Sequence, residues 1–178
     1  EGAGMFILES PDSAQRRGAE VLGRLLGAAS TCGVPTHSKD AAAEALAHCI
    51  TQALASADCE PRDIELIQLH GDATPTGDWI EARGIATALG EHAQIVPATT
   101  IKSATGLMGN ASGPLEVAVA LETLRRGEVL PIVNLRKPDT GFCLNLVRER
   151  QSGLDLQRAL VIQRAWPNLN AAMVIGRG

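Results

Sequence analysis

Aromatic residues are scarce in this sequence, which has no tyrosine and only two phenylalanines and two tryptophans. Proteins that bind single-stranded nucleic acid stack bases on aromatic side chains, so no stacking platform is expected. The sequence also lacks a basic excess, because its formal net charge is −4 and its isoelectric point is near 5.6. These two deficits argue against a nucleic-acid partner and against an anionic membrane surface.

Long apolar runs and paired cysteines are missing as well. Every apolar run is broken well short of the roughly 20 residues that a transmembrane helix needs, so no membrane partner is expected. Cys32, Cys49, Cys59 and Cys143 are spaced neither as zinc ligands nor as a redox pair. We expect no metal site and four free, buried thiols, which are typical of a cytoplasmic protein.

The composition fits one globular domain over residues 1–178. Hydrophobic residues make up 45% of the chain and charged residues 20%, which suffices for a core. The sequence begins with Glu1, and no basic-then-apolar signal segment follows. The opening EGAGMFILE is typical of the middle of a domain, so we expect the chain to start at an internal boundary.

Two kinds of apolar pattern alternate along the chain. Short alternating runs predict strands, and longer runs with helical spacing predict helices. The expected strands are residues 5–9, 63–69, 94–100, 144–147, 159–162 and 171–175, and the expected helices are 41–55, 78–89 and 114–126. Residues 16–29 fit either a helix or a strand. This alternation indicates an α/β fold with a largely parallel sheet.

Capping residues mark the expected helix ends. Asp40 and Asp78 stand as N-caps, and Glu81 follows Asp78 at the spacing of a capping box. Pro114 lies in the first turn of the third helix, and Gly127 follows its last residue.

His70 stands where an expected strand ends, and Gly71 lets the backbone turn there. Ligands of α/β proteins bind beyond the carboxyl ends of strands, so the imidazole is placed to face a cleft. Its neutral form can donate a hydrogen bond to a carbonyl or accept a proton. For a lone histidine, a capping or structural role is the more common explanation of such a position.

A second loop also follows a strand and precedes a helix. It places Lys102 near the strand end and contains Gly106, Gly109 and Gly113. Such a loop suits phosphate binding. The signal is weak, because neither GxGxxG nor GxxxxGK[ST] is present.

Together the two loops resemble the C-terminal half of a β-ketoacyl synthase, the condensing enzyme of fatty acid and polyketide synthesis. The stretches are LHGDATPTGDWIEARGIATALG and VPATTIKSATGLMGNASGPLEVAVALETLRRGEVLPIVNL. The family shows H-G-T-x-T-P-x-G-D followed by E, and then K-S-x-x-G-H-x-x-G-A-A-G. The resemblance implies the C-terminal half of a thiolase-like α/β fold: a mixed, mostly parallel sheet of the five-stranded type with helices on both faces. It also implies that residues 19–29 are mostly strand.

Several residues match the family's motifs. They are His70, Gly71, Thr74, Pro75, Gly77, Asp78 and Glu81 in the first motif, and Lys102, Ser103, Gly106 and Gly113 in the second. The resemblance implies catalytic positions at His70 and Lys102 and a substrate-binding position at Thr74. It gives structural roles to Asp78, Glu81, Gly106, Gly113 and Asn170.

Other positions depart from the family. Leu107 replaces a second catalytic histidine, and Asp72 replaces a threonine that helps to hold the pantetheine arm. The family's N-S-F-G-F-G-G-T-N-A is IQRAWPNLNA here, and its Pro167 removes a backbone donor. Asp72, at the position of that threonine, is therefore expected at the substrate-binding site. We also expect Trp166 at that site, where Trp166 and Leu107 together fill the space in which a substrate thioester would bind.

These departures remove chemistry from the implied site. Condensation in the family uses a cysteine thiolate from the N-terminal half, two histidines and backbone donors for the oxyanion. Leu107 can neither donate nor accept a proton. The chain is therefore most similar to the chain-length factors, the inactive β subunits of ketosynthases. We expect a non-catalytic subunit, with His70 and Lys102 as remnants.

This resemblance implies an active ketosynthase as heterodimer partner, contact with the chain's own N-terminal half, and transient contact with an acyl carrier protein. No cofactor is expected for this chain, since the acyl-phosphopantetheine arm of the acyl carrier protein carries the substrate to the partner's active site. Two alternatives stay open: an active synthase whose cysteine lies in the missing half, and a degenerate scaffold domain of a synthase assembly. The helix at 114–126, which is apolar nearly all round, is expected to be buried centrally.

Overall fold

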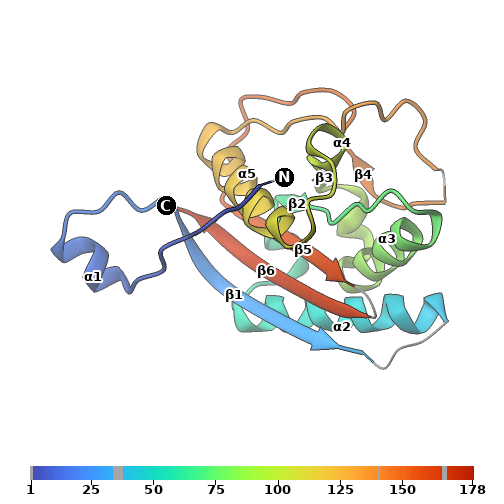
Figure 1. Cartoon of the computed structure of the whole chain (residues 1–178), viewed down its shortest axis with the longest axis horizontal. Helices are drawn as coiled ribbons and strands as arrows, with labels where there is room; N and C mark the ends of the chain where they lie inside the picture. Colours follow the sequence, from blue (N-terminus) through green and yellow to red (C-terminus); the bar gives the residue numbers. More distant parts are fainter. Residues whose placement is uncertain (1, 34–37, 140, 166–167) are drawn as a thin grey trace.

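A single mixed sheet organises the chain (Figure 1). The computed structural model describes residues 2–33, 38–139, 141–165 and 168–178. In the order β1-β6-β5-β2-β3-β4, the described strands are β1 (Gly23–Cys32), β6 (Leu169–Arg177), β5 (Arg158–Ala165), β2 (Leu66–Gln68), β3 (Pro97–Thr99) and β4 (Asn145–Leu146).

The expected mixed, mostly parallel sheet is confirmed. The pairings β5–β2, β2–β3 and β3–β4 are parallel, whereas β6 is antiparallel to both of its neighbours. The described sheet has six strands where the five-stranded type was expected, because the two-residue β4 adds an edge.

Helices cover both faces of the sheet. Helices α2 (Lys39–Ser56) and α3 (Pro75–Leu89) lie on one face and α5 (Ser112–Arg126) lies on the other. The other described helices are α1 (Pro11–Arg16) and α4 (Lys102–Thr105), with 3-10 turns at η1 (Pro61–Asp63), η2 (Gly90–Gln94) and η3 (Gly109–Ala111). Within the described ranges, no helix combines the length and apolar character that a membrane span needs.

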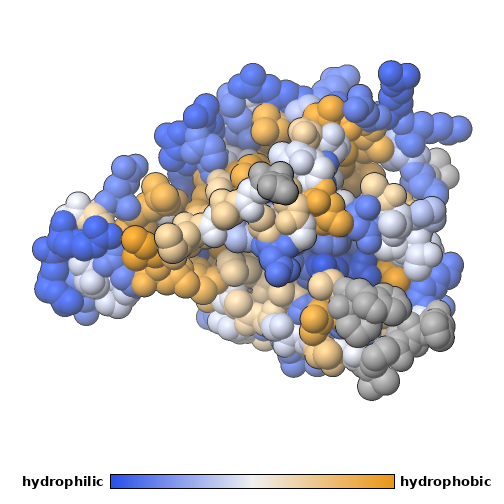
Figure 2. Space-filling model, viewed as in Figure 1, coloured by the Kyte–Doolittle hydropathy of each residue, from blue (hydrophilic) through white to orange (hydrophobic). Residues whose placement is uncertain are grey.

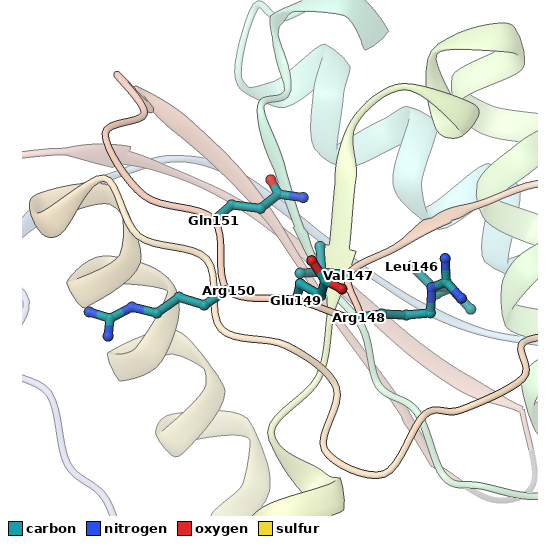
Figure 3. A pocket seen from close by; sticks show the side chains of 6 residues that line it. All are labelled: Leu146, Val147, Arg148, Glu149, Arg150 and Gln151. Atoms are coloured by element: carbon teal, nitrogen blue, oxygen red, sulfur yellow. The ribbon is translucent and has the colours of Figure 1, made fainter.

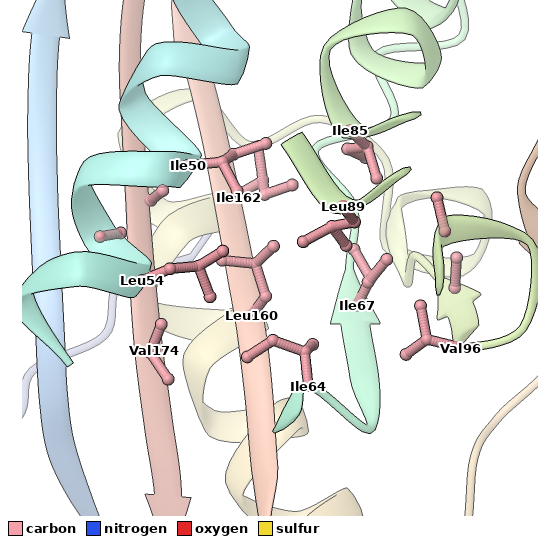
Figure 4. Close-up of a cluster of buried hydrophobic side chains, with 14 of the residues drawn as sticks. Ile50, Leu54, Ile64, Ile67, Ile85, Leu89, Val96, Leu160, Ile162 and Val174 are labelled. Carbon is pink, nitrogen blue, oxygen red and sulfur yellow. The ribbon is translucent and has the colours of Figure 1, made fainter. Parts of the chain in front are cut away.

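The alternation along β5 divides the core into two layers. Leu160 and Ile162 face α2 and α3, where they pack with Ile50 and Ile85 in the larger apolar cluster (Figure 4). Val161 and its neighbours on that side pack against α5 in a second cluster. Because successive strand residues point to opposite faces, one strand supplies both layers.

Two helix caps differ from the sequence-based expectation. The side chain of Ser38, and not Asp40, accepts the N–H of Ala41 at the start of α2. Helix α3 begins at Pro75 with Thr74 as its cap, so Asp78 lies inside the first turn. Both helices start earlier than expected, because a hydroxyl cap precedes each carboxylate by two or more residues.

The expected strand at residues 5–9 is wrong, because these residues form no strand and lie exposed on an arm. Met5, Ile7 and Leu8 are 91%, 85% and 76% exposed. The arm passes the start of α5, where Gly4 lies against Pro114, and then carries α1 away from the body (Figure 1). A strand needs a neighbour to pair with, and the described chain offers none here.

The ambiguous stretch at residues 16–29 resolves as strand. Helix α1 ends at Arg16, where the stretch begins, and the long strand β1 begins at Gly23. The implication that residues 19–29 are mostly strand is confirmed, since residues 23–29 belong to β1. Val21 and Leu22, just before β1, are 45% and 59% exposed. Figure 2 shows apolar surface along the arm and where it leaves the body.

Helix α5 is buried along one stripe and not all round, which corrects the expectation of a fully buried helix. Glu116, Ala120 and Leu124 have no exposed surface, whereas Ala118 is exposed and Leu115 is half-buried. The helix begins at Ser112 with Pro114 in its first turn, and Gly127 ends it with φ of 63°, as expected. An apolar flank of α5 therefore stays open in this chain.

The cysteines are all unpaired, as expected, but they are not all buried. Cys49 is buried under β1, while Cys32 and Cys143 are exposed. Cys32 is the last residue of edge strand β1, where no neighbouring strand covers its outer side in the described part of the chain.

Candidate functional site

His70 and Lys102 meet at one edge of the sheet, as the two loops predicted. The parallel neighbours β2 and β3 end at Gln68 and Thr99, and the two side chains follow just beyond. Each residue is only 8% exposed. The ammonium group of Lys102 donates to the backbone carbonyl oxygen of His70, which ties the two loops together.

Glu81 holds the turn on which His70 stands. Its carboxylate accepts the N–H groups of His70 at 2.6 Å and of Gly71 at 2.8 Å. Gly71 has φ of +56°, and a Cβ there would come within 2.9 Å of Thr100. Burial raises the pKa of Glu81, and the two N–H donors act against that rise. Its carboxylate therefore closes a turn that only glycine fits easily.

Thr74 and Asp72 bond to each other and to the start of α3. The carboxylate of Asp72 accepts from Thr74 N at 3.0 Å and from Thr74 Oγ1 at 2.9 Å. Thr74 Oγ1 in turn accepts the N–H of Gly77. Asp78 accepts the N–H of Ala73, and burial, followed by the charge of Asp72, raises the pKa of Asp78. The side chains of this loop thus accept the free N–H groups at the N-terminus of α3 and in the turn before it.

A buried ion pair underlies the site. Lys102 Nζ donates to Glu116 Oε1, and the two side chains are 5% and 0% exposed. Gln163 Nε2 donates to the other carboxylate oxygen of Glu116. Burial raises the pKa of Glu116 to about 7, more than Lys102 and Gln163 lower it. Glu116 was not among the residues expected at the site, although it is the one acid in the apolar run PLEVAVAL.

The imidazole of His70 is flanked on its Nδ1 side. Gln163 Oε1 lies 3.3 Å from Nδ1, and the backbone N–H of Arg164 lies 3.3 Å from the same atom. Burial, followed by the charge of Lys102, lowers the pKa of His70. The neutral form of the ring is therefore favoured. Gln163 was also missed from the sequence, where its only signal is a polar residue after the apolar run ALVI.

The remaining expected site residues are spread around this centre. Gly106 ends α4 with φ of +75°, Gly113 lies in the first turn of α5, and Asn170 is buried in β6 opposite Arg164. Leu107 is 60% exposed in the loop after α4. Trp166 and Pro167 lie outside the described residues, so the filling of the site by Trp166 and Leu107 stays a prediction.

Two surface depressions lie apart from this cluster. One, of about 310 Å³, is lined by residues 146–151 at the end of β4 (Figure 3). The other, of about 410 Å³, lies between the start of β1 and the start of β5 and includes Arg24, Arg62, Arg158 and Arg177. His70, Lys102 and Glu116 line neither of them.

Curated relatives match the whole of the chain. It is 34% identical over 178 residues to a Streptomyces halstedii sequence that carries the name polyketide beta-ketoacyl synthase 2, and 30% identical over 176 residues to 3-oxoacyl-acyl-carrier-protein synthase 2 of Staphylococcus aureus. These matches cover 100% and 98% of this chain. The chain spans 42% of the length of each relative.

Solved structures share the fold. A type II polyketide ketosynthase complexed with its acyl carrier protein superposes with a TM-score of 0.89 at 27% identity, covering 96% of this chain and 42% of its own. The ishigamide ketosynthase/chain length factor gives 0.86 at 26%, covering 96% and 41%. The fold is thus the thiolase-like one expected. The family model for the beta-ketoacyl synthase C-terminal domain matches residues 22–136, and the chain belongs to that family.

Proposed function

We propose that this chain is part of a non-catalytic ketosynthase-like subunit of the chain-length-factor type. In this proposal it pairs with an active ketosynthase during acyl-carrier-protein-dependent elongation of a polyketide or fatty acid chain. The relatives include polyketide and fatty acid synthases, and one structural neighbour is a ketosynthase/chain length factor. Their names support the pathway class and the kind of partner.

The observation that carries the proposal is Leu107. It stands where the family's motif has a second histidine, and an aliphatic side chain can neither polarise a thioester carbonyl nor move a proton. Loss of one preorganised donor from an active site typically costs about two to three orders of magnitude in rate. The gating loop is rewritten as well, since the family's small-residue run is IQRAWPNLNA here.

The buried network fits a structural role under this proposal. Lys102 binds the carbonyl oxygen of His70 and the carboxylate of Glu116, so its ammonium joins the β2 loop to α5. Glu81 holds the turn from the other side. These contacts stabilise the loops whether or not a substrate reacts beside them. No cofactor is needed, because the phosphopantetheine arm of an acyl carrier protein would serve the partner's site.

A second candidate is an active synthase whose nucleophile lies outside this chain. The motif residues His70 and Lys102 favour it, because they stay buried together beside Glu116 although the second histidine is absent. In that case the single imidazole would have to carry the acid–base work alone.

Replacing His70 with Ala in the complete protein, assembled with its ketosynthase, separates the two. Our proposal predicts that product formation changes by no more than a few-fold, because His70 contributes packing only. His48, an exposed histidine on α2, provides the control His48→Ala, which should leave product formation unchanged. A loss of about three orders of magnitude or more in an intact complex would favour the active enzyme.

A further inference from the structure

One amide side chain touches both halves of the buried network. Gln163 lies near the end of β5 and points to the α5 side of the sheet, on the same side as Val161. Its Nε2 donates to Glu116 Oε2, and its Oε1 lies 3.3 Å from His70 Nδ1. Gln163 therefore bridges a buried carboxylate and the buried imidazole.

The ion pair fixes which end of the amide faces which partner. An amide has one accepting end and one donating end. Above about pH 7 Glu116 carries a negative charge that Lys102 compensates, and an ionised carboxylate only accepts hydrogen bonds. The NH2 group of Gln163 must therefore face Glu116, and its carbonyl oxygen must face His70.

A carbonyl oxygen that faces Nδ1 needs a proton on that nitrogen. The backbone N–H of Arg164 is a competing donor 3.3 Å from the same Nδ1, and the two contacts cannot both be hydrogen bonds to one ring nitrogen. The charge-assisted bond to Glu116 holds the amide in place, so a lone pair on Nδ1 would face the lone pairs of Gln163 Oε1. The arrangement favours the Nδ1–H form of the ring.

We propose that Gln163 is a positioning residue that fixes the neutral His70 ring in the tautomer with its proton on Nδ1 and its lone pair on Nε2. In this form Nε2 accepts a hydrogen bond but cannot donate one to a carbonyl. Polarising a thioester carbonyl requires a donor, so Gln163 removes that ability from His70 while leaving the residue in place. The inference deepens the proposed loss of condensation chemistry and rests on it for its functional meaning.

The ring tautomer is measurable by nitrogen-15 NMR of the complete protein with labelled histidine rings, without substrate, at a pH above about 7, where Glu116 is ionised and His70 is neutral. The wild type should show Nδ1–H. Gln163→Ser introduces the residue that the family's motif has at this position, and Gln163→Met removes the amide while keeping similar bulk. Both variants should show Nε2–H, because the N–H of Arg164 is then free to donate to Nδ1. Gln94→Ser, on the exposed turn η2, should leave the tautomer unchanged.

A wild-type ring protonated on Nε2, or an Nδ1–H tautomer that survives in Gln163→Met, would overturn this inference. A failure of the proposed function is seen in another measurement. It appears as a loss of product formation in His70→Ala, and the nitrogen-15 spectrum of the His70 ring does not report it. The two can therefore fail separately.

Discussion

Glu116 has no exposed surface, and burial raises the pKa of its carboxyl from 4.5 to about 7. The folded protein therefore holds this proton more tightly than the unfolded chain does. The contribution of Glu116 to stability is fully present below about pH 4.5 and is lost as the pH rises through about 7. A pKa that differs by one between the folded and unfolded states corresponds to about 1.4 kcal/mol of unfolding free energy.

Replacing Glu116 with Gln should remove this component of the pH dependence. Urea unfolding between about pH 5 and about pH 8 should show a smaller decline in unfolding free energy for Glu116→Gln than for the wild type. Glu44→Gln, at an exposed position of α2, should keep the wild-type slope. Equal slopes for Glu116→Gln and the wild type would show that Glu116 titrates near its ordinary pKa.

The sequence predicted that His70 and Lys102 lie at the site, but it did not predict the buried Glu116 and Gln163 that contact them. His70 and Lys102 follow strands, so the edge at which they meet follows from an α/β pattern. Glu116 and Gln163 reach the same point from the middle of a helix and a strand, where each looks like one polar residue in an apolar run. Only the register of β5 against β2, and the packing of α5 across them, brings these groups together.

At the scale of single elements, helix starts depend on side-chain contacts that residue spacing does not reveal. Asp72, Thr74 and Asp78 all stand near the start of α3, and each is a residue type that caps helices. The backbone accepts Thr74 as the cap because Pro75 occupies the first helical position.

Replacing Thr74 with Ala should destabilise the protein by about 1 kcal/mol, since the N–H of Gly77 loses its acceptor. Chemical denaturation measures this change. Thr76→Ala, two residues further at an exposed helical site, should not destabilise the protein, because Ala is a better helix former than Thr. Equal costs at the two threonines would show that Thr74 does not cap α3.

The expected strand at residues 5–9 shows a second limit at this scale. Its apolar residues fit a strand, but a strand forms only beside a partner that supplies hydrogen bonds. In this chain the arm has no such partner among the described residues, so Met5, Ile7 and Leu8 lie exposed. The local sequence pattern shows that these residues are apolar, but it does not show whether another strand lies beside them.

On the scale of the whole molecule, the apolar arm passes the start of α5, where Gly4 lies against Pro114, and its Met5, Ile7 and Leu8 are exposed. Exposed apolar surface of this kind is typical of an association site. The chain spans 42% of the length of its Streptomyces halstedii relative.

The isolated 178-residue chain should therefore self-associate. Size-exclusion chromatography should show species larger than a monomer, because the arm and α5 bury their apolar side chains against other copies. Replacing Met5, Ile7 and Leu8 together with Ser should shift the elution toward the monomer. A wild-type chain that elutes as a monomer and unfolds cooperatively would contradict this expectation.

The central claim is that the subunit containing this chain performs no condensation chemistry. Intact-mass analysis of the complete protein, assembled with its ketosynthase and incubated with an acyl-loaded acyl carrier protein, tests this claim directly. A non-catalytic subunit predicts that the acyl group appears on the ketosynthase partner and not on the polypeptide that contains His70. An acyl group on that polypeptide, discharged when malonyl-loaded carrier protein is added, would contradict it.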